Sequence, residues 1–251
     1  MNNIFKSVLL IFFLTISCNK DDSLGNDLNN SNYPYKQQIG YSANDILSNK
    51  IFTTIIIEVM YIDGFKPTSE TLTNLKKFIG LRTYKTNILI EERLIDISTK
   101  SIYSIDDVRN IEDLNRSIFT IENQLAISAL FLNGSSSSDS GNSVILGTSY
   151  RNTSFVIFEE KIQSLSNVHA GTSLEVLEST IILHEFCHLL GLVNFGTEMI
   201  NNHEDTANKA HCSVENCLMY HQVENAQSIF GGQIPQLDPF CLEDLKANGG
   251  K

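Results

Sequence analysis

The sequence predicts an α/β domain with a twisted, mostly parallel sheet, and three observations lead to this fold class. Short β-branched, apolar segments are typical of buried strands, and segments with one apolar helical face separate them. Hydrophobic residues make up 42% of the 251 residues, enough to bury a core. Strands that alternate with helices favour parallel pairing, because each helix crosses over to the next strand.

Strands are expected where β-branched and apolar residues cluster, at 51–61, 86–97, 124–132 and 154–159. A first helix is expected to begin at 67–70 and to bury one face, formed by Leu72, Leu75, Phe78 and Ile79. A second helix is expected from Ser104 to about Asn115. It begins with a capping box in which Asp107 replaces the usual Glu.

The third expected helix carries the chemistry. A capping box of Thr172 and Glu175 precedes an apolar run that ends in His184-Glu185-Phe-Cys-His188. The i, i+4 spacing puts both imidazoles on one face, where they can bind a single Zn²⁺. Glu185 is placed to accept a proton from a zinc-bound water. The alternative is two unrelated histidines on a polar face, but the flanking residues are apolar, and buried His and Glu need partners.

A catalytic zinc site needs a third protein ligand. Gly191 fits a helix stop with positive φ, but three residues later stands Asn194, a poor zinc ligand. Further along, His211-Cys-x4-Cys-x-Met219 resembles the archaemetzincin signature, which in that family directly follows the H-E-x-x-H-x-x-G segment. The resemblance implies that His211 is the third ligand, Met219 the Met-turn residue beneath the metal, and 194–210 an insert.

Other residues remain candidates for parts of this site. His203 is the rival third ligand, and an acid such as Glu198, Glu204 or Asp205 is a further alternative, all within the polar insert or its surroundings. Tyr220 or His221, beside the Met-turn residue, could donate to the developing oxyanion, with simple packing or solvation as the alternative.

The resemblance to metzincins also implies details of architecture. The strand at 154–159 would be the sheet edge over the cleft, where an extended peptide adds by β-augmentation. The alternative is an interior strand that is paired on both sides. A small C-terminal subdomain would hold the Met-turn and a terminal helix.

The N-terminus predicts export. Residues 1–17 carry Lys6 and a short apolar run, as a secretory signal peptide does, and Cys18 follows. Cys18 resembles the acylated cysteine of bacterial lipoproteins, with an ordinary cleaved signal as the alternative. Residues 18–40 would be a lipidated, flexible tether and 41–251 the zinc metalloprotease domain. The wider pattern resembles the archaemetzincin-like "membrane metalloprotease" lipoproteins of Bacteroidetes-type bacteria, which implies an outer-membrane, lipid-anchored protein of the cell envelope. The acidic residues after Cys18 favour surface display.

The cysteine pattern does not predict a second, structural zinc, so one catalytic zinc is expected. Archaemetzincins use further cysteines, including a C-x-x-C, for a structural zinc, but this chain has only Cys241 downstream. In an exported protein, Cys212 and Cys217 are expected to form a disulfide. Cys187 could pair with Cys241, or both could be free buried thiols.

The charge limits the partners. With 18 basic and 29 acidic residues the formal net charge is −11, which argues against nucleic acid or anionic membrane surfaces as the main partner. The membrane contact expected is the lipid anchor alone. The favoured function is a zinc peptidase acting on a peptide or protein. The alternatives are a non-catalytic, zinc-containing surface lipoprotein (an adhesin or binding module) and a zinc hydrolase of a non-peptide amide.

Overall fold

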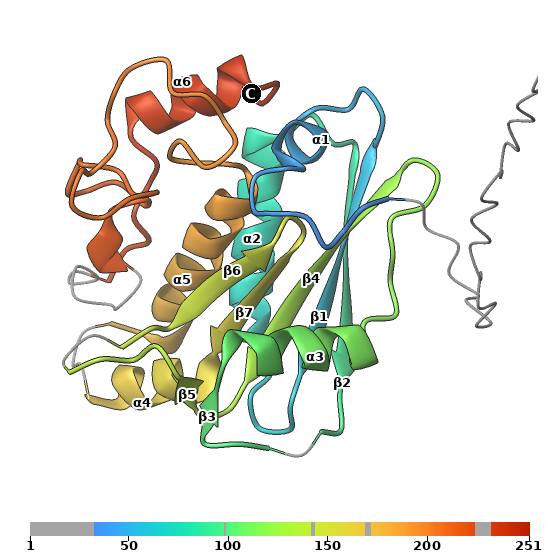
Figure 1. The fold of residues 1–251 in the computed structure, drawn as a ribbon, viewed down its shortest axis with the longest axis vertical. Helices are drawn as coiled ribbons and strands as arrows, with labels where there is room; N and C mark the ends of the chain where they lie inside the picture. The colour runs from blue at the N-terminus through green and yellow to red at the C-terminus, as the bar shows by residue number, and fades with distance from the viewer. Residues whose placement is uncertain (1–32, 98, 142–143, 169–171, 224–231) are drawn as a thin grey trace, which may run out of the picture. The chain divides into compact units, whose positions relative to one another are not determined.

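A five-stranded sheet organises the computed structural model of the protein (Figure 1), which describes residues 33–97, 99–141, 144–168, 172–223 and 232–251. The strand order is β2-β1-β4-β7-β6, and only β6 runs antiparallel to its neighbour, so the expected mostly parallel sheet is confirmed. Its strands are β1 (Thr54–Tyr61), β2 (Asn87–Leu94), β4 (Gln124–Leu132), β6 (Gly147–Arg151) and β7 (Ser154–Phe158). A separate two-stranded sheet pairs β3 (Ile102–Tyr103) with β5 (Ser135–Ser136).

Helices cover both faces of the sheet. They are α1 (Ala43–Leu47), α2 (Ser69–Arg82), α3 (Ile105–Asn115), α4 (Glu159–Val168), α5 (Leu174–Leu189), the 3-10 turn η1 (His221–Val223) and α6 (Pro239–Ala247). Helices α2 and α5 lie on one face and α3 on the other (Figure 1). At α3 the expected capping box is present, with Ser104 and Asp107 bonding reciprocally. At α5 the expected capping box of Thr172 and Glu175 is wrong, because the N-cap residue is Ser173, one position after Thr172.

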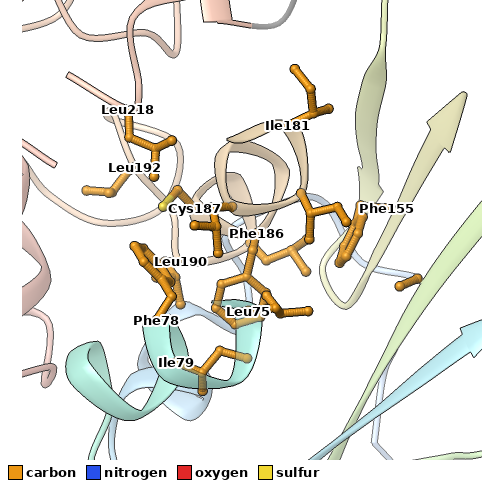
Figure 2. Close-up of a cluster of buried hydrophobic side chains, with 14 of the residues drawn as sticks. Leu75, Phe78, Ile79, Phe155, Ile181, Phe186, Cys187, Leu190, Leu192 and Leu218 are labelled. Atoms are coloured by element: carbon orange, nitrogen blue, oxygen red, sulfur yellow. The ribbon is translucent and has the colours of Figure 1, made fainter. Parts of the chain in front are cut away.

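Two cores result from the alternation of side chains along the strands. On β4, Leu125 and Ile127 pack in the core shared with α2 and α5, whereas Leu130 and Leu132 pack in a second core, on the α3 side. Figure 2 shows the first core where α5 meets α2: Phe186 of α5 lies among Leu75, Phe78 and Ile79 of α2. This packing fixes α5, the helix that carries the H-E-x-x-H segment, against the sheet.

The edge strand is β6 and not the strand predicted at 154–159. That segment is β7, which pairs with β4 on one side and with β6 on the other. All five residues of β7 are buried, which suits an interior strand. The sequence analysis missed β6 because Gly147-Thr-Ser-Tyr-Arg151 is too polar to resemble a buried strand.

Described residues before 41 pack on the domain. Gln37 and the turn between β6 and β7 are joined by two hydrogen bonds: Asn152 N–H donates to Gln37 O at 3.0 Å, and Gln37 N–H to Asn152 Oδ1 at 2.9 Å. The described part of the expected tether, from 33 to 40, therefore packs on the domain. The expected signal peptide and Cys18 lie outside the described residues. Within the described ranges no helix is both long and apolar enough to cross a bilayer.

Candidate active site

Helix α5 brings its two histidines together as the spacing predicts. His184 and His188 are 0% and 7% exposed, and their Nε2 atoms lie 3.2 Å apart. The helix is buried along nearly its whole length, so these polar side chains sit in an apolar surround. Two imidazole nitrogens held this close suit a shared cation, because buried polar groups need compensation.

His211 completes a cluster of three imidazoles. It reaches α5 from the long loop after the helix, and its ring lies 5.3 Å, centroid to centroid, from each of the other two rings. The potential ligand atoms of His184, His188 and His211 all lie within 4.8 Å of one another. We call these three residues the imidazole cluster.

Two backbone carbonyls orient the rings of this cluster. His184 Nδ1 donates to Leu218 O at 2.7 Å, and His211 Nδ1 donates to Lys209 O at 3.0 Å. Because a carbonyl can only accept, both Nδ1 atoms carry the proton, and Nε2 is left as the ligand atom. Tetrahedral zinc with Zn–N bonds of about 2.05 Å separates its nitrogens by about 3.3 Å. The distance of 3.2 Å between the Nε2 atoms of His184 and His188 fits two such ligands of one zinc ion.

The end of α5 explains why the third histidine comes late in the chain. Gly191 has φ +77°, as expected for the residue that stops the helix, and a Cβ there would lie 2.6 Å from Thr197 N. Thr197 Oγ1 donates to Leu190 O at 2.6 Å and holds the turn. The chain then leaves the site through the insert and returns at His211.

A hollow of about 280 Å³ lies against Glu185, beside the imidazole cluster. Its lining comes from the segment before α1, from β6 and the residues before it, from α5 and from the loop after it: Ile39, Ile145, Gly147, Thr148, Ser149, Glu185, His188, Phe195, Ala210 and His211. Ser149 Oγ donates to the backbone oxygen of Glu185 at 2.7 Å, which ties β6 to α5. A Cβ at Gly147 would lie 2.8 Å from Glu185 Cγ, so this close approach of β6 requires glycine.

A second cluster forms where the insert meets α6. His203 Nδ1 lies 3.3 Å from Cys212 Sγ and 4.0 Å from Cys241 Sγ, and Cys217 Sγ lies 3.7 Å from Cys241 Sγ. We call His203, Cys212, Cys217 and Cys241 the sulfur cluster. All four are buried. His203, Cys212 and Cys241, together with Asp238, are close enough to hold one metal ion.

The spacing and the hydrogen bonds of the sulfur cluster are compatible with metal binding. Tetrahedral zinc with Zn–S bonds of about 2.3 Å separates two sulfurs by about 3.8 Å, close to the 3.7 Å between Cys217 and Cys241. Hydrogen bonds from the other thiols and from the N–H groups of Asp238 and Met219 lower the pKa of Cys217. His203 Nε2 donates to Asp244 Oδ2 at 2.8 Å, which leaves Nδ1 as its ligand atom.

The sulfur cluster corrects one expectation and decides two questions that the sequence left open. Cys212 and Cys217 form no disulfide, because both are free thiols turned toward Cys241 and His203. His203, the alternative third ligand for the site at His184 and His188, lies in the sulfur cluster and not beside His184. Cys187 is a free, buried thiol in the core with α2, and it does not pair with Cys241.

The residues around the expected Met-turn are also placed. Met219 is fully buried, next to Leu218, whose carbonyl holds His184. Tyr220 packs on His221, with ring centroids 4.5 Å apart, and His221 Nδ1 lies 3.3 Å from Asp205 Oδ2. Neither Tyr220 nor His221 lines the hollow at Glu185, so their oxyanion role stays a prediction.

Comparison with solved structures identifies the fold. The chain is similar to the archaemetzincin of Methanopyrus kandleri, with a TM-score of 0.50 and 14% identity over 78% of this chain and 96% of that chain. The chain has an archaemetzincin-like fold. Weaker matches are a zinc-dependent peptidase of Methanocorpusculum labreanum (TM-score 0.46, 11% identity, 75% and 99% covered) and the archaemetzincin of Archaeoglobus fulgidus complexed with malonate (0.43, 15%, 76% and 99%). No protein-family model matches the sequence, and no curated protein does.

On this archaemetzincin-like fold the sequence analysis missed the walls of the hollow. Gly147 and Ser149 belong to the polar edge strand, and Ile39 to the segment taken as tether. Phe195 follows the helix stop and packs against His188, with ring centroids 6.1 Å apart. A usable signal was present only at 147–151, where a short stretch before an apolar strand is separated from it by an Asn-Thr turn.

Proposed function

We propose that the protein is a zinc-dependent peptidase whose active site is the imidazole cluster with Glu185. One observation carries the proposal: three imidazoles with converging Nε2 atoms lie beside a carboxylate, in a hollow against the sheet edge. Structural zinc sites are closed, whereas catalytic ones combine three protein ligands with an open position. The solved structures similar to this chain include archaemetzincins and a zinc-dependent peptidase, which supports the same activity here.

We assign each residue of the site a separate role in peptide hydrolysis. His184, His188 and His211 would hold the zinc, which would supply a Lewis acid for the scissile carbonyl and for water. Glu185 accepts the proton of the attacking water and passes it to the leaving amine. The backbone of β6 aligns the peptide as an added strand. Met219, buried behind Leu218, is the proposed Met-turn residue of a metzincin-type site.

We further propose a second zinc in the sulfur cluster, so that the chain holds two ions instead of one. Three thiols and one imidazole form a Cys₃His set, a common structural zinc site. His203 takes the place of a fourth cysteine, and Asp244 orients it. The role is structural, since the cluster is buried and also fixes the loop that carries His211.

We also propose that the chain is exported and anchored through acylated Cys18 at the cell envelope. The support is the N-terminal sequence, with its short apolar run before a cysteine. A Cys18→Ser variant is expected to leave the membrane fraction. Unchanged sedimentation with membranes would contradict the lipid anchor.

The activity is tested by digesting a peptide library with the purified chain, before and after treatment with a zinc chelator. We expect cleavage that stops on chelation and returns when zinc is added back. A chain that binds zinc at the imidazole cluster but cleaves no peptide would favour the non-catalytic or non-peptide alternatives.

A further inference from the structure

Among the described residues no strand pairs with the outer edge of β6, and this free edge faces the hollow at Glu185. Phe158 N–H donates to Leu146 O at 2.9 Å, so in this antiparallel pair Leu146 and Thr148 turn their backbone groups toward β7. The backbone groups of Gly147 and Ser149 therefore point to the free edge, where a peptide can pair with them. At Asn152 the edge ends, because Gln37 pairs there.

The two faces of this edge differ. Gly147 and Ser149 face α5, as shown by their contacts with Glu185. Thr148 faces the opposite side, toward α3. Side chains of neighbouring strands project in register, so a substrate residue beside Thr148 projects to the α3 face. The residues on either side of it project toward α5 and the imidazole cluster.

A second hollow, of about 260 Å³, lies on that α3 face. It shares Ile145 and Thr148 with the hollow at Glu185, so the two adjoin at the sheet edge. Its floor and walls are mainly apolar: Tyr103, Ile105, Val108, Ile145, Val156 and Phe158. Serines and Thr148 supply the rest of the described lining, and no charged residue is part of it. Tyr103 and Val108 are each 1% exposed, so the floor belongs to the second core.

We propose that this second hollow is a specificity subsite, which binds an aliphatic or aromatic side chain of the peptide substrate. The inference rests on the proposed peptidase function. The position of the hollow and its apolar lining identify the side chain that it binds. The hollow stands where the substrate residue beside Thr148 must project, and its lining offers apolar contact without a charge to pair. Burial of a Leu or Phe side chain there removes more apolar surface from water than burial of Ala, so the larger residues are favoured.

The test compares peptides that differ only at one position, Leu against Ala, scanned along the sequence. Wild-type protein is expected to prefer Leu or Phe over Ala about tenfold or more in kcat/KM at one position. Val108→Phe fills the hollow from α3 and is expected to abolish that preference by lowering kcat/KM for the Leu peptide to the value for the Ala peptide. Ser138→Phe fills it from the exposed rim and serves if Val108→Phe does not fold. Leu114→Phe is the matched control on α3, because Leu114 is 85% exposed and outside the lining.

The outcomes separate the subsite from the activity. Loss of the Leu preference in a filled variant, with the control unchanged, supports the subsite. Cleavage by the wild type without any such preference, or a preference that survives in the folded filled variants, overturns the subsite alone. Absence of cleavage by zinc-loaded wild-type protein overturns the proposed function and the subsite with it.

Discussion

The imidazole cluster and the sulfur cluster share one stretch of chain but differ in what surrounds them. His211 and Cys212 are adjacent, yet the first turns to α5 and the second to α6. The imidazole cluster borders a hollow that contains Glu185, whereas the sulfur cluster is enclosed by buried groups, among them Asp238 and Asp244. In the proposed function, this difference in ligand type and access assigns the imidazole cluster to catalysis and the sulfur cluster to structure.

The clusters are also mechanically linked. Cys212 N–H donates to Met219 O at 2.7 Å, and Leu218, the residue before Met219, holds His184 through its carbonyl. The sulfur cluster therefore fixes the loop that orients two ligands of the other cluster. Variants that affect one cluster and spare the other test this division of roles.

The largest effect is expected for Glu185→Gln. It removes the proposed general base but none of the metal ligands, so turnover should fall about a hundredfold or more while both zinc ions stay bound. Peptide cleavage and zinc content measure this directly. Glu175→Gln, in the first turn of the same helix, is the control and should keep full activity. Equal turnover in both variants would reject Glu185 as the base.

Cys217→Ser should act on stability first. Loss of one thiolate ligand should release one zinc per chain and lower Tm by roughly 10 °C, since each kcal/mol is worth about 2–4 °C at this size. Cys187→Ala is the matched control, because Cys187 is equally buried but lies outside the sulfur cluster. Two zinc ions retained in Cys217→Ser would mean that Cys217 is not a ligand, and a single zinc ion in the wild type would mean that the cluster is only a packed group of thiols.

Gly147→Ala tests how β6, at the sheet edge, positions Glu185 beside the imidazole cluster. The added Cβ would lie 2.8 Å from Glu185 Cγ and 3.1 Å from its Oε1, so the carboxylate must shift. We expect turnover to fall about tenfold, equal to about 1.4 kcal/mol, with zinc content nearly unchanged. Tm should fall as well, because the added Cβ would also lie 2.9 Å from Cγ2 of the buried Ile181. Gly80→Ala is the control for glycine replacement without a positive φ, because the added Cβ would lie 3.7 Å from Ile88 Cδ1, an ordinary contact distance. A loss of zinc in Gly147→Ala would show that β6 supports the metal ligands themselves.

Much of this arrangement follows from sequence, and the rest depends on tertiary pairing. The apolar strands, α2, α3 and the i, i+4 histidines are local patterns, so they were predictable. The edge strand β6 is polar and short, and only its pairing with β7 reveals it. His203 joins Cys241 across 38 residues, and no local spacing announces such a contact.

A further effect concerns a titratable group away from both clusters. Burial, with Glu178 nearby, raises the pKa of Glu159 to about 10. Between pH 4.5 and 10 the folded state thus keeps a proton that the unfolded chain loses, so the free energy of unfolding falls as pH rises. Glu159→Gln should remove this slope, at most about 1.4 kcal/mol per pH unit.

Denaturant unfolding of the zinc-loaded protein at several pH values measures that difference. Because the variant keeps both clusters, the contributions of the metal sites cancel between variant and wild type. The advantage of Glu159→Gln should grow from pH 6 to pH 9, whereas Glu70→Gln, exposed on α2, should show no such trend. A constant difference at all pH values would mean that Glu159 is ionised in the folded protein.

The most direct test of the central claim is an anomalous difference map at the zinc edge from crystals of the zinc-loaded protein. We expect two peaks. One should be bounded by the Nε2 atoms of His184, His188 and His211, and the other by Cys212, Cys217, Cys241 and His203 Nδ1. A single peak within the sulfur cluster, with the imidazole cluster empty, would contradict a catalytic zinc at α5.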